Sequence, residues 1–214
     1  MINRIFIMVV ILAALCSFSV YADLVDGLYF QIGQTWVGNS QDVSSPNPII
    51  IQFNTGVIMD LPWLLYLSPD VFVGGYHYTW QEEQAMAIPV AREFATGSYV
   101  LYVNIDPGFG LRLPVTDSVA FGVSLGPAFL LRFPVLSYGG GKENAPNILG
   151  YLLGGGRFFY PQTSAQLDWA FSDSIRFLLK LRVFYPIHHY WTGDSLPFYD
   201  QLIIQNNIGF VFEL

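Results

Sequence analysis

Apolar residues alternate with small or polar residues through most of the chain, and this period of two is typical of β-strands. The clearest run lies within 118–133, where one face is expected to carry Val119, Phe121, Val123, Leu125, Phe129, Leu131 and Phe133. The intervening positions include Gly122, Ser124 and Arg132. A second run within 174–186 places Arg176, Lys180 and Arg182 opposite an apolar face. The pattern therefore predicts an all-β protein whose sheet has one apolar face.

The same reading predicts eight strands. They are expected at 27–37, 49–67, 71–80, 98–113, 118–133, 156–171, 174–186 and 201–214. Tight turns are predicted in Leu67–Val73, Val115–Phe121 and Phe171–Phe177, because Ser, Pro and Asp favour turn geometry. Longer connections are predicted at 38–48, 81–97, 137–147 and 188–200. Short turns on one side and long loops on the other are typical of bacterial membrane barrels. A hairpin at 81–97 would raise the count to ten strands.

Alternation alone does not say which face is outside, since a soluble lipocalin-like barrel would turn the apolar face inward. The tryptophans favour a membrane. Trp63 and Trp169 lie near the short turns, and Trp36, Trp80 and Trp191 lie near the long loops. Two levels of amphipathic rings match two membrane interfaces. We therefore predict a transmembrane up-and-down antiparallel β-barrel of eight strands, formed by residues 23–214.

The first 22 residues have the pattern of a secretory signal peptide. Arg4 precedes an apolar run from Ile5 to Leu15, and small-residue positions precede a cleavage site after Ala22. The single cysteine, Cys16, lies within this segment and is not preceded by the small residue that a lipidation site requires. We expect cleavage after Ala22 and export of residues 23–214; a retained helical anchor is the alternative.

Composition supports the membrane interpretation. Charged residues make up only 12% of the chain, against roughly 25% in soluble domains. Because Arg4 is the only charge in 1–22, the remaining chain carries 16 acidic and 8 basic residues. This balance argues against nucleic-acid binding. No cofactor is expected.

The last strand carries a pattern associated with barrel assembly. Its apolar positions alternate up to the final residue: Ile208, Phe210, Phe212 and Leu214. With this ending, the chain resembles the small eight-stranded outer-membrane barrels, the group that contains the OmpA transmembrane domain, OmpX and OmpW. The resemblance implies an outer-membrane location, contact with outer-membrane lipids, and recognition of the last strand by the assembly machinery. Two departures are Leu214, where that signal usually has Phe, and Asn206 on the expected lipid face.

An eight-stranded barrel has an interior that side chains fill. Parity places nine charged residues inside: Asp60, Asp106, Arg112, Arg132, Asp168, Arg176, Lys180, Arg182 and Glu213. Buried charges are costly unless they are paired. We therefore expect an ion-pair network that plugs the lumen, with a selective conduit as the alternative.

Three prolines suggest a functional opening. Pro107, Pro127 and Pro161 fall at similar heights on consecutive expected strands, and proline cannot donate to the hydrogen-bond ladder. Missing donors near the outer leaflet could open the wall sideways, and OmpW-like proteins are thought to bind or pass small hydrophobic molecules by such a gap. Bulges or strand ends are the structural alternative.

Two other functions remain open. Some barrels of this group modify lipid A, and the deacylase kind resembles a His and Ser two residues apart, but Thr79 follows His77 and Tyr190 follows His188 at that spacing. We therefore expect no enzyme. The long loops carry acidic and aromatic side chains that could contact a host surface, and a purely structural barrel is also possible. Gly139–Gly141 and Gly154–Gly156 are expected to be loop and strand start, without a helix after the first.

Overall fold

The chain is described by a computed structural model that covers residues 25–40, 49–90, 97–139, 141–193 and 196–214. The expected signal peptide and its cleavage site after Ala22 lie outside these residues. Among the described residues the strands are β1 (Gly27–Val37), β2 (Ile49–Asp60), β3 (Leu65–Leu67), β4 (Asp70–Gln81), β5 (Met86–Val90), β6 (Gly97–Asp106), β7 (Phe109–Pro114), β8 (Val119–Tyr138), β9 (Phe159–Ser172), β10 (Ile175–Phe184) and β11 (Ile203–Glu213).

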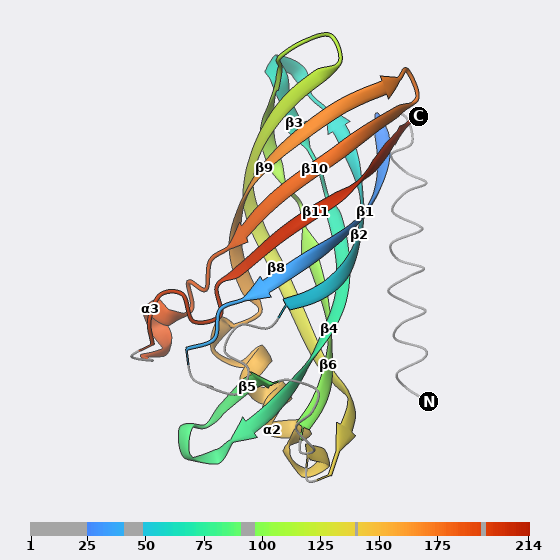
Figure 1. The fold of residues 1–214 in the computed structure, drawn as a ribbon. Helices are drawn as coiled ribbons and strands as arrows, with labels where there is room; N and C mark the ends of the chain where they lie inside the picture. Colours follow the sequence, from blue (N-terminus) through green and yellow to red (C-terminus); the bar gives the residue numbers. More distant parts are fainter. Residues whose placement is uncertain (1–24, 41–48, 91–96, 140, 194–195) are drawn as a thin grey trace.

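These segments form a closed, antiparallel ring of eight strands. Two ring strands are interrupted, so that β3 continues into β4 and β6 continues into β7. The ring closes where β1 pairs with β11, from Gly27 opposite Glu213 to Val37 opposite Ile203. Figure 1 shows the tilted strands with the C-terminus and the short turns at one end and the long connections at the other. The predicted fold class is confirmed.

The outer face of the ring is apolar, as alternation predicts. Its exposed side chains include Phe30, Ile51, Phe53, Leu125, Phe129, Leu181, Phe210 and Phe212. The side chains between them point into the barrel and are mostly polar or small, and many of them are buried. A soluble protein rarely exposes such a continuous apolar surface. The face that contacts lipid is therefore the outside of the barrel.

One short turn lies elsewhere than predicted. The chain reverses at Leu61–Leu64, through a 3-10 turn at Pro62–Leu64, and not within Leu67–Val73. Trp63 and Leu64 adopt positive φ angles there, which are uncommon for residues other than glycine. The stretch around Ser68 and Pro69 instead interrupts a single ring strand between β3 and β4. The other two short turns lie where they were predicted.

A folded cap covers the end of the barrel that carries the long connections. The strand β5 pairs with the end of β4, so the stretch after Gln81 contains a hairpin outside the ring of eight. A helix, α2 (Gly141–Leu153), packs on β4, β5, β6 and β8 (Figure 1). It is followed by the 3-10 segment Gly154–Gly156. The expectation that no helix would follow Gly139 is therefore wrong.

Apolar side chains join the cap to the barrel. One cluster holds α2 against the extended strands and contains Tyr78, Met86, Ala87, Ile88, Val100, Ile148, Tyr151 and Leu152. A second cluster fills the lumen beneath it, with Val37, Ile50, Phe72, Tyr102, Ala128, Leu130, Tyr160, Phe184 and Ile203. Within the described ranges, no helix is long and apolar enough to cross a membrane. We call the unit formed by β5, α2 and the ends of β4, β6 and β8 the cap.

Candidate functional site

The lumen contains a cluster of fully buried charges at mid-height. Arg182 on β10 contacts Asp70 on β4 through both terminal nitrogens, and its Nη1 lies 3.6 Å from the Asp106 carboxylate on β6. The Lys180 Nζ lies 3.4 Å from Asp70 Oδ2, the oxygen that Arg182 Nη2 also contacts. The Tyr29 hydroxyl donates a hydrogen bond of 2.5 Å to the same oxygen. We call Asp70, Asp106, Lys180 and Arg182 the mid-lumen cluster. It has two charges of each sign.

Asp70 is the residue that the sequence analysis missed, because it was placed in a turn. It lies directly opposite Asp106 in the ladder between β4 and β6. Two adjacent carboxylates would repel each other, and only cations from another wall of the barrel make the pair tolerable. A signal was present in the sequence: the nine predicted lumen charges are five cations and four carboxylates, so a balanced lumen required one more carboxylate.

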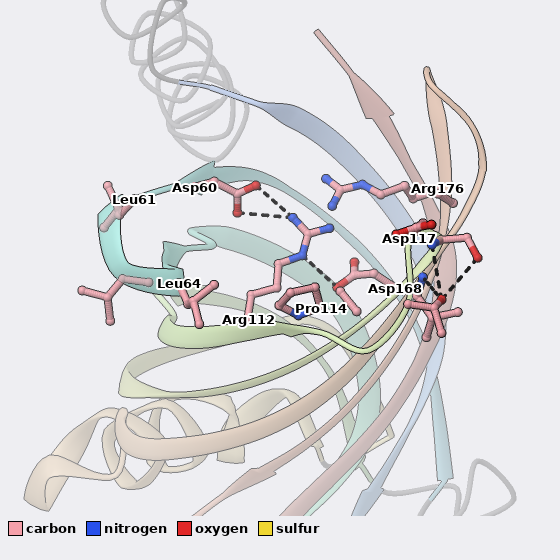
Figure 2. Close-up of a pocket in the computed structure, with 14 residues that line it drawn as sticks. Asp60, Leu61, Leu64, Arg112, Pro114, Asp117, Asp168 and Arg176 are labelled. Carbon is pink, nitrogen blue, oxygen red and sulfur yellow. Dashed lines mark hydrogen bonds and ion pairs between the residues drawn. The ribbon is translucent and has the colours of Figure 1, made fainter.

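A second group of charges lines the open end of the barrel near the short turns. Figure 2 shows this cavity, of about 380 Å³, with Asp60, Arg112, Asp168 and Arg176 around it. Arg112 bridges Asp60 at 3.0 Å and Asp168 at 3.5 Å. Arg176 pairs with Glu213. Asp60 is about half exposed, so it belongs to the rim of the barrel and not to its interior.

The remaining predicted lumen charge, Arg132, forms no ion pair with another described residue. It lies on β8 above the mid-lumen cluster and is 3% exposed. Its guanidinium donates to the backbone oxygen of Arg157 at 2.8 Å and lies 5.8 Å from the centre of the Tyr160 ring. The nine predicted charges therefore divide into a mid-lumen cluster, a group at the short-turn end and one separate cation.

The three candidate prolines lie in one row across the wall. Pro127 on β8 is directly opposite Pro161 on β9. The register on either side of the break between β6 and β7 places Pro107 opposite Pro127. By the same reading, Pro69, in the break between β3 and β4, is opposite Pro107. The row thus has a fourth member that was not predicted.

Backbone hydrogen bonds remain beside this proline row and at its two ends. At Gly108 the backbone N–H turns inward and donates to the Asp106 carboxylate at 2.9 Å, while the Gly108 carbonyl accepts from Ser68 N at 2.8 Å. At the ends of the row, the carbonyls of Pro69 and Pro161 accept from the flanking strands. The lumen behind the row is filled by the apolar cluster beneath the cap.

The predicted assembly signal forms the outer face of the closing strand. Ile208, Phe210, Phe212 and Leu214 are all exposed, as is Asn206 on the same face. Phe210 and Phe212 contact outward rings on the two neighbouring strands, Phe177 on β10 and Phe30 on β1. The alternation therefore provides a continuous apolar surface where the barrel closes.

The three histidines pack against aromatic rings or against each other. His77 lies between the rings of Tyr99 and Tyr138. His188 is fully buried beside Tyr160. Its ring centre is 4.5 Å from that of His189, at the start of the short helix α3 (His189–Thr192). Within the described part of the chain, no group of three or more His, Cys, Asp or Glu could hold a metal ion.

The connection between β10 and β11 presents aromatic side chains to the outside. Tyr190 is 91% and Phe198 81% exposed, and Trp191 and Tyr199 are also exposed. The Trp191 indole donates to the Gly155 carbonyl at 2.7 Å, which fixes α3 to the segment that follows α2. Asp200, on the same connection, is buried and accepts a hydrogen bond from the Ser40 hydroxyl. Asp42, Glu93 and Asp194, three further acidic residues of the long connections, lie outside the described residues.

No family model and no curated protein matches the chain. The solved structures that it resembles include Neisserial surface protein A, at 7% identity and a TM-score of 0.49, covering 88% of this chain and 96% of that one. Ail, the attachment invasion locus protein of Yersinia pestis, in complex with the heparin analogue sucrose octasulfate, has 7% identity and a TM-score of 0.47, covering 88% and 97%. The N-terminal β-barrel domain of Pseudomonas aeruginosa OprF has 10% identity and a TM-score of 0.37, covering 89% and 98%. The barrel fold of this chain rests on its own closed ladder of strand pairs and its apolar outer face.

Proposed function

We propose that the chain is a non-enzymatic integral outer-membrane protein that anchors a folded cap at the cell surface and acts there by contact with a partner. The observation that carries this proposal is the closed interior. The cap packs over the lumen, an apolar cluster fills the barrel beneath it, and the mid-lumen cluster lies below that. A barrel filled at these levels is poorly suited to general diffusion.

The outer surface of the cap end offers the chemistry of a contact site. The aromatic side chains Tyr190, Trp191 and Phe198 are exposed next to the cap. Glu82 and Glu83, in the hairpin between β4 and β5, are exposed as well. Aromatic side chains are enriched at protein interfaces because they bury a large area at a small entropic cost. The same rings could also contact lipid headgroups, so the test must separate these two roles.

The test uses fluorescent liposomes that contain the refolded protein, applied to surfaces coated with laminin, with collagen or with cultured epithelial cells. We expect retention above that of empty liposomes, and loss of retention in the variant Tyr190→Ser/Phe198→Ser. Trp63→Ser is the matched control, because Trp63 is equally exposed at the opposite end of the barrel. The same preparations should show no stable conductance in planar bilayers. Retention equal to that of empty liposomes on every surface, or stable open channels, would contradict the proposal.

A second candidate function is a lateral route for small hydrophobic molecules. The observation that favours it is the proline row, in which Pro69, Pro107, Pro127 and Pro161 supply no N–H to four consecutive strands. An apolar solute entering here would have to displace Phe72, Tyr102 and Tyr160 from the cluster behind the row.

Replacing Pro107, Pro127 and Pro161 together with Val restores three donors to the wall. If the route exists, uptake of an apolar fluorescent solute into liposomes should fall severalfold, while folding remains intact on a gel. The control is Pro186→Val, because Pro186 is also buried but lies outside the proline row. Unchanged uptake in the triple variant would exclude this route.

A further inference from the structure

The outer face of the barrel carries a pair of amide side chains among apolar neighbours. Outside the cap, the described ring strands bury most of their Asn and Gln side chains in the lumen: Gln31, Gln52, Asn54, Asn104, Gln162, Gln166, Gln205 and Asn207. Gln34 on β1 and Asn206 on β11 are exposed instead. They lie directly opposite each other in the ladder that closes the ring, where Figure 1 shows β1 beside β11. The two exceptions to the inward pattern are therefore neighbours on the lipid-facing wall.

This amide pair lies within the apolar band and not at its edge. Apolar side chains surround it along the strands and across the ladder: Ile32, Trp36, Ile51, Leu181, Ile204 and Ile208. Asn206 lies six positions before Phe212, the last outward ring on β11 before the short-turn end. At ~3.3 Å per residue and a tilt of ~40°, this is about 15 Å of height in a band about 25 Å tall. Both amides are therefore at the depth of the lipid chains.

Amide side chains at this depth favour contact with a hydrogen-bonding partner. Each amide has two donors and one acceptor oxygen, and lipid chains offer no partner for any of them. Polar side chains at membrane depth are costly for this reason, and they stabilise the association of membrane segments by hydrogen bonds. A bond between Gln34 and Asn206 uses one donor and one acceptor, and the other groups still face lipid. The wall is therefore suited to a partner that brings amides of its own.

We propose that the wall formed by β1 and β11 is the contact surface between two copies of this chain, related by a two-fold axis along the membrane normal. Such an axis keeps both copies in the same orientation and at the same depth. Placed between β1 and β11, it brings Gln34 of each copy opposite Asn206 of the other. Each copy thus supplies the donors and acceptors that the other requires. The surface lies on the barrel wall, so the proposal is independent of what the cap contacts.

The test uses single cysteines, because residues 23–214 contain none of their own. Ile208→Cys lies on β11 beside the proposed axis, and Leu125→Cys is the matched control, on β8 at the opposite wall and exposed as well. Each variant is refolded into lipid vesicles over a range of protein-to-lipid ratios and treated with a short thiol crosslinker. We expect Ile208→Cys to form covalent dimers on an SDS gel in severalfold excess over Leu125→Cys.

Substitutions of the amides, made in the Ile208→Cys protein, test their role. Gln34→Leu/Asn206→Leu should raise the dissociation constant of the dimer about tenfold, and it should stay folded because the change places apolar groups toward lipid. Gln34→Asn/Asn206→Gln exchanges the two amides and should keep the dimer. Thr163→Val removes an exposed hydroxyl from β9 and should have no effect. A gel shift between unboiled and boiled samples verifies the fold of each variant.

Three results would overturn the proposal. The first is equal crosslinking of Ile208→Cys and Leu125→Cys at every protein-to-lipid ratio. The second is a dissociation constant that Gln34→Leu/Asn206→Leu leaves unchanged. The third is crosslinking of Ile208→Cys in outer membranes to a different protein and not to a second copy, which would assign the amide pair to another partner.

Discussion

Removing the charge of Asp70 should destabilise the barrel more than any other conservative change to a carboxylate. Asp70→Asn keeps the size of the side chain but leaves Lys180 and Arg182 facing Asp106 alone. It also weakens the Tyr29 hydrogen bond of 2.5 Å. Removing one partner of a buried ion pair costs about 3–5 kcal/mol, because the other charge stays buried without compensation. We expect a loss of free energy of unfolding in that range.

The rim carboxylate Asp60 provides the matched control. It also pairs with an arginine, Arg112, at 3.0 Å, but it is half exposed. Exposed ion pairs contribute about 0–1 kcal/mol, so Asp60→Asn should have a small effect. The double variant Asp70→Asn/Lys180→Met restores the balance of charge and should recover a large part of the loss.

The assay is equilibrium urea unfolding in lipid vesicles, followed by tryptophan fluorescence and by the difference in migration between folded and unfolded protein on a gel. Equal effects of Asp70→Asn and Asp60→Asn would refute the view that the mid-lumen cluster is a buried, mutually dependent group. Failure of Lys180→Met to recover any stability would show that charge balance is not the reason for the loss.

Three further predictions concern the closing strand, the lipid face and the cap. Gly209→Ala should cost about 1–3 kcal/mol in the same urea assay, because the new methyl group would overlap the Phe30 carbonyl oxygen and the interior offers no space. Phe210→Lys should cost about 2–4 kcal/mol if the position lies near the bilayer midplane, because the new charge would face lipid. A folded fraction equal to that of the unaltered protein would contradict the contact of Phe210 with lipid. Burial raises the pKa of Tyr151 on α2, so its contribution to cap stability is full below the usual phenol pKa and is lost as the pH rises through the raised value. Proteolysis of the cap should therefore increase at strongly alkaline pH, and Tyr151→Phe should reduce this increase.

The barrel was predictable because its information is local and repeated. Alternation along each strand fixes which side chains face lipid, and Phe210 or Val123 needs no distant partner to be placed. The inward direction of Arg132, Lys180 and Arg182 followed from the same parity. Their pairing did not, because Arg182 meets Asp70 across the barrel, at a sequence separation that no strand pattern encodes.

The errors also have physical causes. The stretch Leu67–Val73 looks like a turn because it contains Ser, Pro and Asp, yet the proline there only interrupts the strand. The real turn uses positive φ at Trp63 and Leu64, which residue preferences argue against. The helix α2 begins after glycines and contains Pro146, which favours a loop locally. Tertiary packing of Ile148 and Leu152 on the cap strands overrides that preference.

The central claim is a closed strand barrel with its apolar face toward lipid, and the most direct measurement is the heat modifiability of residues 23–214 refolded in detergent. A closed barrel keeps its hydrogen bonds in SDS until it is boiled, so the unboiled sample should migrate faster than the boiled one and show circular dichroism typical of strands. Identical migration of the two samples, together with solubility in the absence of detergent, would mean that the apolar face points inward and would contradict the account.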